Sequence, residues 1–304
     1  MAAMFLLFSI ASAGQSPPLP EGIASRDRDL IYGRKYGMSL TMDRFVPAKP
    51  NGKAVVWVVS GGWFSNPDAI NAATAAPLCK AGYQVFAVCH GSQPRFTIPE
   101  ILDDMHRSTR WIRANASRFQ VDPGAIGVTG GSAGGHLSLM LGMVHRPGDA
   151  KAKDPVDRQP SGCQAVACFF PPTDFLNWTK PGEVMLGKPH LLKNLPPAFD
   201  FHTQDKLTGQ FRLITDEKER ERIGKEISPI SHISAGSAPV YLVQGTSDLL
   251  VPQSQADTFM AALKEKGIAG ELVIKRGAGH GWAGMDKDLE QFANWFDKHL
   301  AAKR

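Results

Sequence analysis

Several features that would point to other classes of protein are absent from the 304-residue sequence. The formal net charge is +5 at pH 7, but no run of lysine or arginine accompanies it, so no nucleic-acid partner is expected. The apolar run near the N-terminus, residues 4–10, is too short to span a bilayer, so no stable membrane insertion is expected. The chain shows no internal repeats, and no pair of its four cysteines has zinc-finger spacing.

The cysteines occur in or beside apolar stretches, since Cys89 ends one and Cys168 lies inside another. Buried free thiols are therefore predicted for Cys79, Cys89, Cys163 and Cys168. A disulfide between Cys79 and Cys89 remains open as the alternative, because spacing alone does not determine connectivity.

The N-terminus has an apolar run followed by the small residues Ala11, Ser12 and Ala13. This pattern predicts a cleaved signal peptide over residues 1–13 and a secreted or periplasmic protein. No lysine or arginine precedes the apolar run, so a native terminus or a misplaced start codon is the alternative. Residues 14–26, which include a proline-rich stretch, are expected to be a linker.

The rest of the chain, 27–304, alternates buried-strand and helix patterns, and 43% of the sequence is hydrophobic. This alternation predicts an α/β fold with a mostly parallel sheet and helices on both faces. Strands are expected at 30–36, 38–46, 54–59, 83–88, 125–129, 165–170, 240–244 and 271–275. Helices are expected at 69–81, 98–116, 133–144, 253–266 and 286–302. Between 174 and 228 the alternation stops, which indicates an inserted cap or lid.

The strongest chemical signal is a glycine-rich turn between a predicted strand and a predicted helix, Gly130-Gly131-Ser132-Ala133-Gly134-Gly135. This is the context of the Gly-x-Ser-x-Gly nucleophile elbow, in which a sharp turn exposes the serine hydroxyl and requires small neighbours. Ser132 is therefore the predicted nucleophile. A phosphate-binding loop is the alternative, but the lysine of that motif is absent.

A carboxylate and a histidine follow later strands in the order that such a triad requires. Asp248 ends the loop after the strand at 240–244, and His280, flanked by glycines, follows the last strand. Asp248 is predicted to orient His280, which is the predicted general base. Asp174, which follows an earlier strand, is the competing acid. His136, in the first turn after the elbow, is expected to pack there.

The loop after the first long apolar strand contains two glycines and two bulky aromatic residues, Ser60-Gly61-Gly62-Trp63-Phe64. Loops at this position supply a second amide to an oxyanion hole, and glycine lets the backbone approach the substrate. The predicted hole comprises the amide of Ala133 and that of Gly61 or Gly62. A plain strand-to-helix turn is the alternative.

Taken together, these segments resemble the esterase/lipase branch of the α/β-hydrolase superfamily over residues 27–300. They are most similar to hormone-sensitive-lipase-like proteins and to bacterial acetyl xylan and feruloyl esterases. The specific pieces are Gly-Gly-Ser-Ala-Gly-Gly-His at 130–136, Gly-Thr-Ser-Asp at 245–248 and Gly-His-Gly-Trp at 279–282. In one departure, Ser60 stands where the family usually has histidine in His-Gly-Gly-Gly.

The resemblance implies ester hydrolysis through an acyl-enzyme, with no metal or organic cofactor. Substrate contacts are expected from Trp63, Phe64, His90 and Trp282. The bulky loop favours short acyl groups, acetyl or feruloyl groups on plant polysaccharide among them. Aromatic residues of the insertion are expected either to face a sugar or phenolic alcohol or to form its own small core: Phe175, Trp178, Phe199, Phe201 and Phe211.

Two other functions remain open at this stage. An exopeptidase of the same fold usually carries a large extra domain and acidic anchors for a peptide amine, and neither is evident in this sequence. A catalytically inactive binding module typically loses a triad residue, whereas this chain has all three.

Overall fold

The computed structural model describes residues 18–93, 95–186, 199, 201–205 and 207–300. The expected signal peptide, 1–13, lies outside the described residues, and export remains a prediction. Within the described part, no helix is long and apolar enough to cross a membrane.

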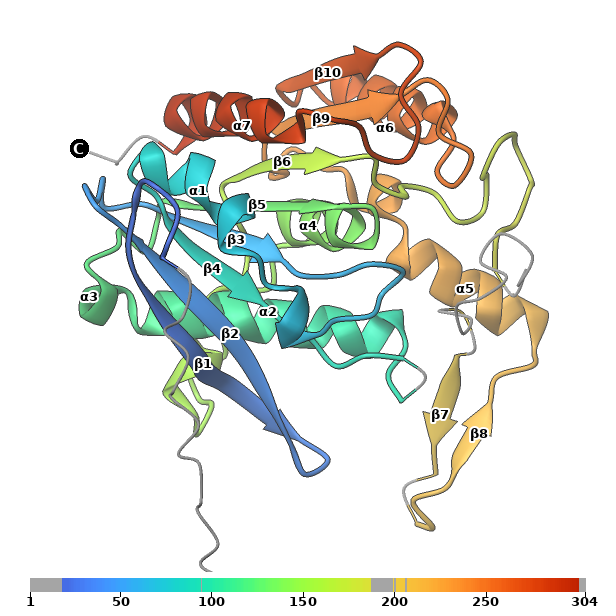
Figure 1. Cartoon of the computed structure of the whole chain (residues 1–304). Helices are drawn as coiled ribbons and strands as arrows, with labels where there is room; N and C mark the ends of the chain where they lie inside the picture. The colour runs from blue at the N-terminus through green and yellow to red at the C-terminus, as the bar shows by residue number, and fades with distance from the viewer. Residues whose placement is uncertain (1–17, 94, 187–198, 200, 206, 301–304) are drawn as a thin grey trace, which may run out of the picture.

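An eight-stranded sheet with the order β1-β2-β4-β3-β5-β6-β9-β10 forms the centre of the structure (Figure 1). Strands β1 and β2 form an antiparallel hairpin, β2 pairs antiparallel with β4, and the other neighbours are parallel. The α/β architecture with a mostly parallel sheet is therefore confirmed. The strands are Ile23–Lys35 (β1), Met38–Pro47 (β2), Ala54–Val58 (β3), Gln84–Val88 (β4), Ile126–Gly131 (β5), Ala165–Phe169 (β6), Val240–Gly245 (β9) and Gly270–Lys275 (β10).

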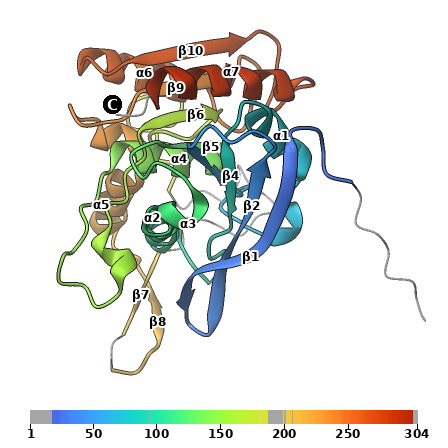
Figure 2. The same ribbon diagram turned by 90° about the vertical axis from the view of Figure 1, so that its left-hand side faces the viewer.

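Helices cover both faces of this sheet (Figures 1 and 2). Helices α1 (Ala72–Lys80) and α7 (Met285–His299) pack on one face, where they contribute to one hydrophobic cluster. Helices α2 (Ile98–Ala114), α4 (Ala133–Met143) and α6 (Gln253–Glu265) contribute to the cluster on the other face. The inner strands are apolar runs because both of their faces are buried.

The structure extends the first strand beyond its predicted start. Residues 23–26, which were assigned to the linker, belong to β1, where Ile23 pairs with Pro47 of β2. Arg26 forms an ion pair of 2.5 Å with the buried Asp43 of the same hairpin. The start of this strand was not predicted, because most side chains of β1 are at least partly exposed and its sequence is therefore polar.

Two predicted helices begin or end differently in the structure. The 98–116 pattern divides at Asn115 into α2 and the short α3 (Ala116–Phe119). The 69–81 pattern begins as the 3-10 helix Pro67–Ala69, and α1 starts only after Asn71, whose side chain accepts a hydrogen bond from the Ala73 amide. Asparagine is a strong N-cap residue, and this explains the later start.

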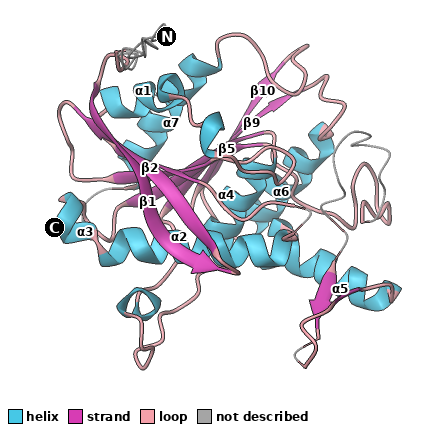
Figure 3. Cartoon of the chain, turned by 60° about the horizontal axis from the view of Figure 1, so that its bottom comes forward, coloured by secondary structure: helices cyan, strands magenta, loops and turns pink. Residues whose placement is uncertain are grey.

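The inserted segment forms a small unit beside the sheet. It contains the strand pair β7 (His202–Gln204) and β8 (Phe211–Leu213), followed by α5 (Glu217–Ile227). Figure 3 shows these elements apart from the main sheet. Short 3-10 helices at Pro155–Arg158 and Pro229–His232 complete the described secondary structure. Most of the aromatic residues of the segment are buried, whereas Phe211 is 40% exposed.

Candidate active site

The turn between β5 and α4 holds Ser132 in an unusual backbone conformation, with φ 54° and ψ −121°. The residues two positions before and after it, Gly130 and Gly134, are glycines because other backbone segments lie very close. A Cβ atom on Gly130 would lie 2.6 Å from the Gly134 carbonyl oxygen, and one on Gly134 would lie 2.7 Å from the Val58 carbonyl oxygen. The local geometry is therefore that of a nucleophile elbow, with the serine at the carboxyl end of β5.

A continuous hydrogen-bonded chain connects Ser132, His280 and Asp248. The Ser132 hydroxyl lies 2.8 Å from His280 Nε2, and His280 Nδ1 lies 2.7 Å from Asp248 Oδ2. The ionised carboxylate accepts the Nδ1 proton, which leaves Nε2 as the acceptor for the serine hydroxyl. This tautomer is the one that allows the imidazole to take a proton from the serine.

Asp248 is held as an anion by its surroundings. Its Oδ1 accepts hydrogen bonds from the amides of Leu250 and Val251, both at 2.9 Å. Burial raises the pKa of Asp248, but the hydrogen bonds from His280 and from these amides outweigh it, so that the pKa lies below its ordinary value.

The competing acid, Asp174, has a different environment. Its carboxylate accepts hydrogen bonds from the amides of Leu176 and Asn177 and from the Asn177 side chain, so it stabilises a local turn. The structure therefore brings Asp248, and not Asp174, to the histidine.

The loop that carries His280 is tied to the loop that carries Asp248. The Ser247 amide donates to the Ala278 carbonyl over 2.8 Å, and a Cβ atom on Gly245 would lie 2.4 Å from the same oxygen. The imidazole also packs on the ring of Phe170, with 4.4 Å between ring centroids. These contacts place the histidine with little freedom to rotate.

The loop after β3 forms a tight turn beside the serine. Gly61 and Phe64 exchange two backbone hydrogen bonds of 2.9 Å, and the central residues Gly62 and Trp63 have φ values of 55° and 62°. Positive φ at both central positions is the pattern of a type I′ turn. The Gly61 amide, one of the two amides predicted for the oxyanion hole, donates to the Phe64 carbonyl within this turn. The Ala133 amide is in the first turn of α4, where it has no intrahelical acceptor.

Trp63 is buried, and His136 holds its side chain. The indole N–H donates to His136 Nδ1 over 3.1 Å, and His136 Nε2 donates to the Ile227 carbonyl over 2.7 Å. Burial lowers the pKa of His136 to about 4, so the ring is neutral in this bridge. The sequence predicted only that His136 packs after the elbow, because its partners come from segments distant in the sequence.

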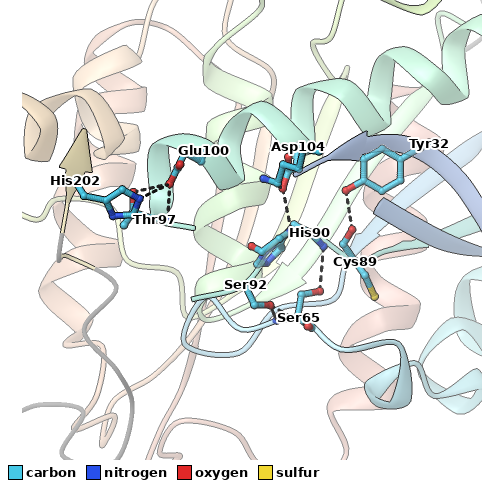
Figure 4. A network of polar contacts seen from close by, with 11 residues as sticks. Tyr32, Ser65, Cys89, His90, Ser92, Thr97, Glu100, Asp104 and His202 are labelled. Carbon is cyan, nitrogen blue, oxygen red and sulfur yellow. Dashed lines mark hydrogen bonds and ion pairs between the residues drawn. The ribbon is translucent and has the colours of Figure 1, made fainter. Parts of the chain in front are cut away.

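His90 lies behind the loop instead of in the pocket, which corrects its assignment as a substrate contact. Its Nδ1 donates to the Gly91 carbonyl over 2.8 Å, so Nε2 accepts the Ser60 hydroxyl over 2.8 Å. Figure 4 shows the network around His90, which includes a bond from its amide to the Ser65 hydroxyl. Burial lowers the pKa of His90 to about 4. Ser60 and His90 together therefore hold the loop from behind.

Trp282 is also placed away from the pocket. Its indole N–H donates to Asp288 Oδ2 over 2.7 Å, and its ring packs edge-on against Phe169 and Phe170. Trp282 is therefore a packing residue between the histidine loop and α7, and its assignment as a substrate contact is corrected.

A pocket of about 630 Å³ opens over Ser132 and His280, within the size range of small-molecule sites. Trp63 and Phe64 are among its lining residues, and their contact with a substrate stays a prediction. The insertion contributes Trp178, Met185 and Phe199, so its aromatic residues serve both the core and the pocket. In the described part of the chain, no group of three or more potential metal ligands is present.

The four cysteines are free and buried in the structure. Burial raises the pKa of Cys79 and of Cys163 to about 12 and that of Cys89 to about 11. These thiols have the character of packing residues rather than nucleophiles.

Sheet order, elbow and histidine loop together define the α/β-hydrolase fold. The BD-FAE family model matches residues 42–263, and the chain belongs to this family. A carbohydrate esterase from gut microbiota has a similar fold, with a TM-score of 0.69 at 22% identity over 93% of this chain and 99% of that one. The propionate-bound esterase Est2 from Thermogutta terrifontis is similar, with a TM-score of 0.67 at 23% identity over 92% of this chain and 93% of that one.

Curated relatives are similar over part of their length. The probable carboxylic ester hydrolase LipM of Mycobacterium tuberculosis is 27% identical over 246 residues, 79% of this chain and 52% of LipM. An acetylxylan esterase of Xylanibacter ruminicola is 33% identical over 122 residues, 36% of this chain and 24% of that protein. The chain thus spans about half the length of LipM.

Proposed function

We propose that the protein is a serine carboxylic ester hydrolase that acts on esters of short acyl groups. The observation that carries this proposal is the hydrogen-bonded chain from Ser132 through His280 to Asp248 at the base of an accessible pocket. The names of several relatives, among them LipM and the acetylxylan esterase, support the same chemistry.

The proposed reaction has two acyl-transfer steps. Ser132 Oγ attacks the ester carbonyl carbon while its proton moves to His280 Nε2, and Asp248 stabilises the imidazolium that forms. The amides of Gly62 and Ala133 are the proposed donors to the carbonyl oxygen as it becomes negative. The protonated His280 then gives its proton to the leaving alcohol, and a water molecule releases the acid from Ser132 by the reverse sequence.

The pocket lining favours an ester over a peptide. The described lining residues include no aspartate, glutamate, lysine or arginine, so nothing there offers an acidic anchor for a peptide amine. Bulky side chains at the turn, Trp63 and Phe64, leave limited room on that side and favour short acyl groups. Acetyl groups on plant polysaccharide are the proposed natural substrate class, with feruloyl groups as the alternative.

Two measurements test the proposal directly. A fluorophosphonate probe should label the wild-type protein and leave the Ser132→Ala variant unlabelled, because the probe reacts only with an activated serine. Nitrophenyl esters with acyl groups of two to twelve carbons, together with acetylated xylan and methyl ferulate, should then give the highest kcat/KM on a short acyl group. Near wild-type turnover by Ser132→Ala would contradict the assignment of the nucleophile, and a maximum at eight or more carbons would contradict the short-acyl specificity.

A further inference from the structure

A second hollow of about 360 Å³ lies beside the pocket, between the sheet and helices α1 and α7. Two residues, Trp57 and Gly131, line both spaces. Gly131 directly precedes the serine, so the second hollow begins one residue away from the nucleophile. The two spaces therefore adjoin at Trp57 and Gly131.

Trp57 is the only partly exposed residue of strand β3, which is otherwise buried. It pairs in register with Thr129 of β5, and it packs in the same cluster as α1 and α7. A side chain on an inner strand beneath two helices is expected to be fully buried. The exposed part of Trp57 is explained by the hollows that it borders.

The second hollow is mainly apolar. Leu78, Val85, Phe169 and Leu289 line it and form a surface suited to a hydrocarbon chain, while Asp286 is the one acidic residue of the lining. Thr129 is 2% exposed, and its hydroxyl has no hydrogen-bond partner among the described residues. An unpaired buried hydroxyl costs free energy, so this wall also retains the capacity to bind one polar atom.

The acyl group is the part of an ester that must fit here. In the acyl-enzyme the acyl carbon is bonded to Ser132, so its chain has to extend into space that adjoins the serine. The insertion residues Trp178, Met185 and Phe199 also line the pocket, and they come from a different segment of the chain. Trp57 and Gly131 are shared by the pocket and the second hollow, so the part of the pocket beside Trp57 is the part that adjoins the second hollow.

We propose that Trp57 closes the acyl end of the pocket, and that the hollow behind it is a latent subsite for longer acyl chains. This inference rests on the proposed ester hydrolysis. Trp57 is thus a specificity-determining residue: with the indole in place, chains end at Trp57, and with a smaller side chain they enter the second hollow.

The test compares kcat/KM for nitrophenyl esters of two to twelve carbons in the wild type and in Trp57→Ala. Each methylene that enters an apolar site gains about fourfold. Octanoate has six more methylenes than acetate, and if the last three of them enter the second hollow, the octanoate-to-acetate ratio of kcat/KM rises by about 60-fold. Trp57→Leu removes less of the ring and should shift the ratio in the same direction by a smaller factor, which keeps the test valid if Trp57→Ala folds poorly.

Two further variants make the test specific. Thr74 lines the second hollow, so Thr74→Phe added to Trp57→Ala should refill it and reverse the shift. Trp111 is a half-buried tryptophan that packs on Phe119 and borders neither hollow, so Trp111→Ala should leave the ratio unchanged.

Three outcomes overturn the proposal. In the first, the octanoate-to-acetate ratio of kcat/KM stays within threefold of wild type in both Trp57 variants. In the second, Trp111→Ala shifts this ratio as much as the Trp57 variants do. In the third, kcat/KM changes among acetate esters of longer alcohols and not in the acyl series. A wild-type protein that hydrolyses no ester would instead refute the proposed function itself, and the two failures are therefore distinguishable.

Discussion

Asp248→Asn is the substitution whose effect follows most directly from the geometry of the site. In the wild type, Asp248 Oδ1 accepts two amides, those of Leu250 and Val251, and Oδ2 faces His280 Nδ1. An asparagine has one oxygen and one NH₂ group at these two positions. Because an NH₂ group facing two backbone donors would leave both of them unpaired, the oxygen remains with the amides and the NH₂ group faces the histidine.

That orientation forces the wrong histidine tautomer. The asparagine NH₂ donates to Nδ1, so the imidazole proton moves to Nε2, where it faces the Ser132 hydroxyl instead of accepting its proton. In a related triad the same exchange lowers kcat by about 10⁴. A factor of that size corresponds to about 5 kcal/mol of transition-state stabilisation. We expect a similar loss in kcat and little change in KM, since the pocket lining is unaltered.

The assay is steady-state hydrolysis of nitrophenyl acetate, and Asp174→Asn is the matched control. Asp174 is also a buried carboxylate after a central strand, and it also accepts two backbone amides, but it lies on a local turn. Its kcat should remain within about threefold of wild type, and urea unfolding should show that both variants fold. Asp248→Asn activity above one-hundredth of wild type, or an equal loss in Asp174→Asn, would refute the reasoning.

Three further predictions concern the surroundings of the site. Ser60→Ala removes the hydrogen bond to His90 and should lower the free energy of unfolding by about 1 kcal/mol, measured by urea unfolding; an unchanged urea midpoint would argue against this support. Burial lowers the pKa of His90 and His136 to about 4 and that of His106 to about 3. Below pH 6.5 the unfolded chain therefore binds more protons than the folded one. As the pH is lowered from 6.5 to about 4, the free energy of unfolding should fall by up to about 1.4 kcal/mol per pH unit for each histidine. A urea midpoint that rises as the pH is lowered from 7 to 5 would contradict this. Thiol titration should find fewer than one reactive cysteine in the native protein and four in urea, because all four are buried; rapid native reaction would contradict that burial.

The positions of the central strands were predictable because burial on both faces leaves a continuous apolar run in the sequence. The elbow was predictable for a related reason. Gly130 and Gly134 are the residues at which neighbouring backbone leaves no room for a Cβ atom, and such steric demands appear directly as glycine. By contrast, the start of β1 was missed, because an exposed edge hairpin carries no apolar pattern.

The assignments that failed depend on contacts between distant segments. His90 and Trp282 were expected at the substrate, but His90 is hydrogen-bonded to Ser60 in the loop after β3 and Trp282 to Asp288 in α7. The sequence did not distinguish Gly61 from Gly62 as a donor. The turn in which Gly61 pairs with Phe64 distinguishes their amides. A histidine or a glycine can have several structural or catalytic roles, and the role depends on the hydrogen-bond partner that the fold brings to it.

The fold class and the order of Ser132, Asp248 and His280 along the chain could be predicted from the residues alone, because periodicity and steric demands are local properties of the polypeptide. The choice between Asp248 and Asp174 as the partner of His280 needed the three-dimensional packing, because both are carboxylates that follow central strands. The same is true of the two hollows that Trp57 borders, because a cavity is formed by several segments that lie far apart in the sequence.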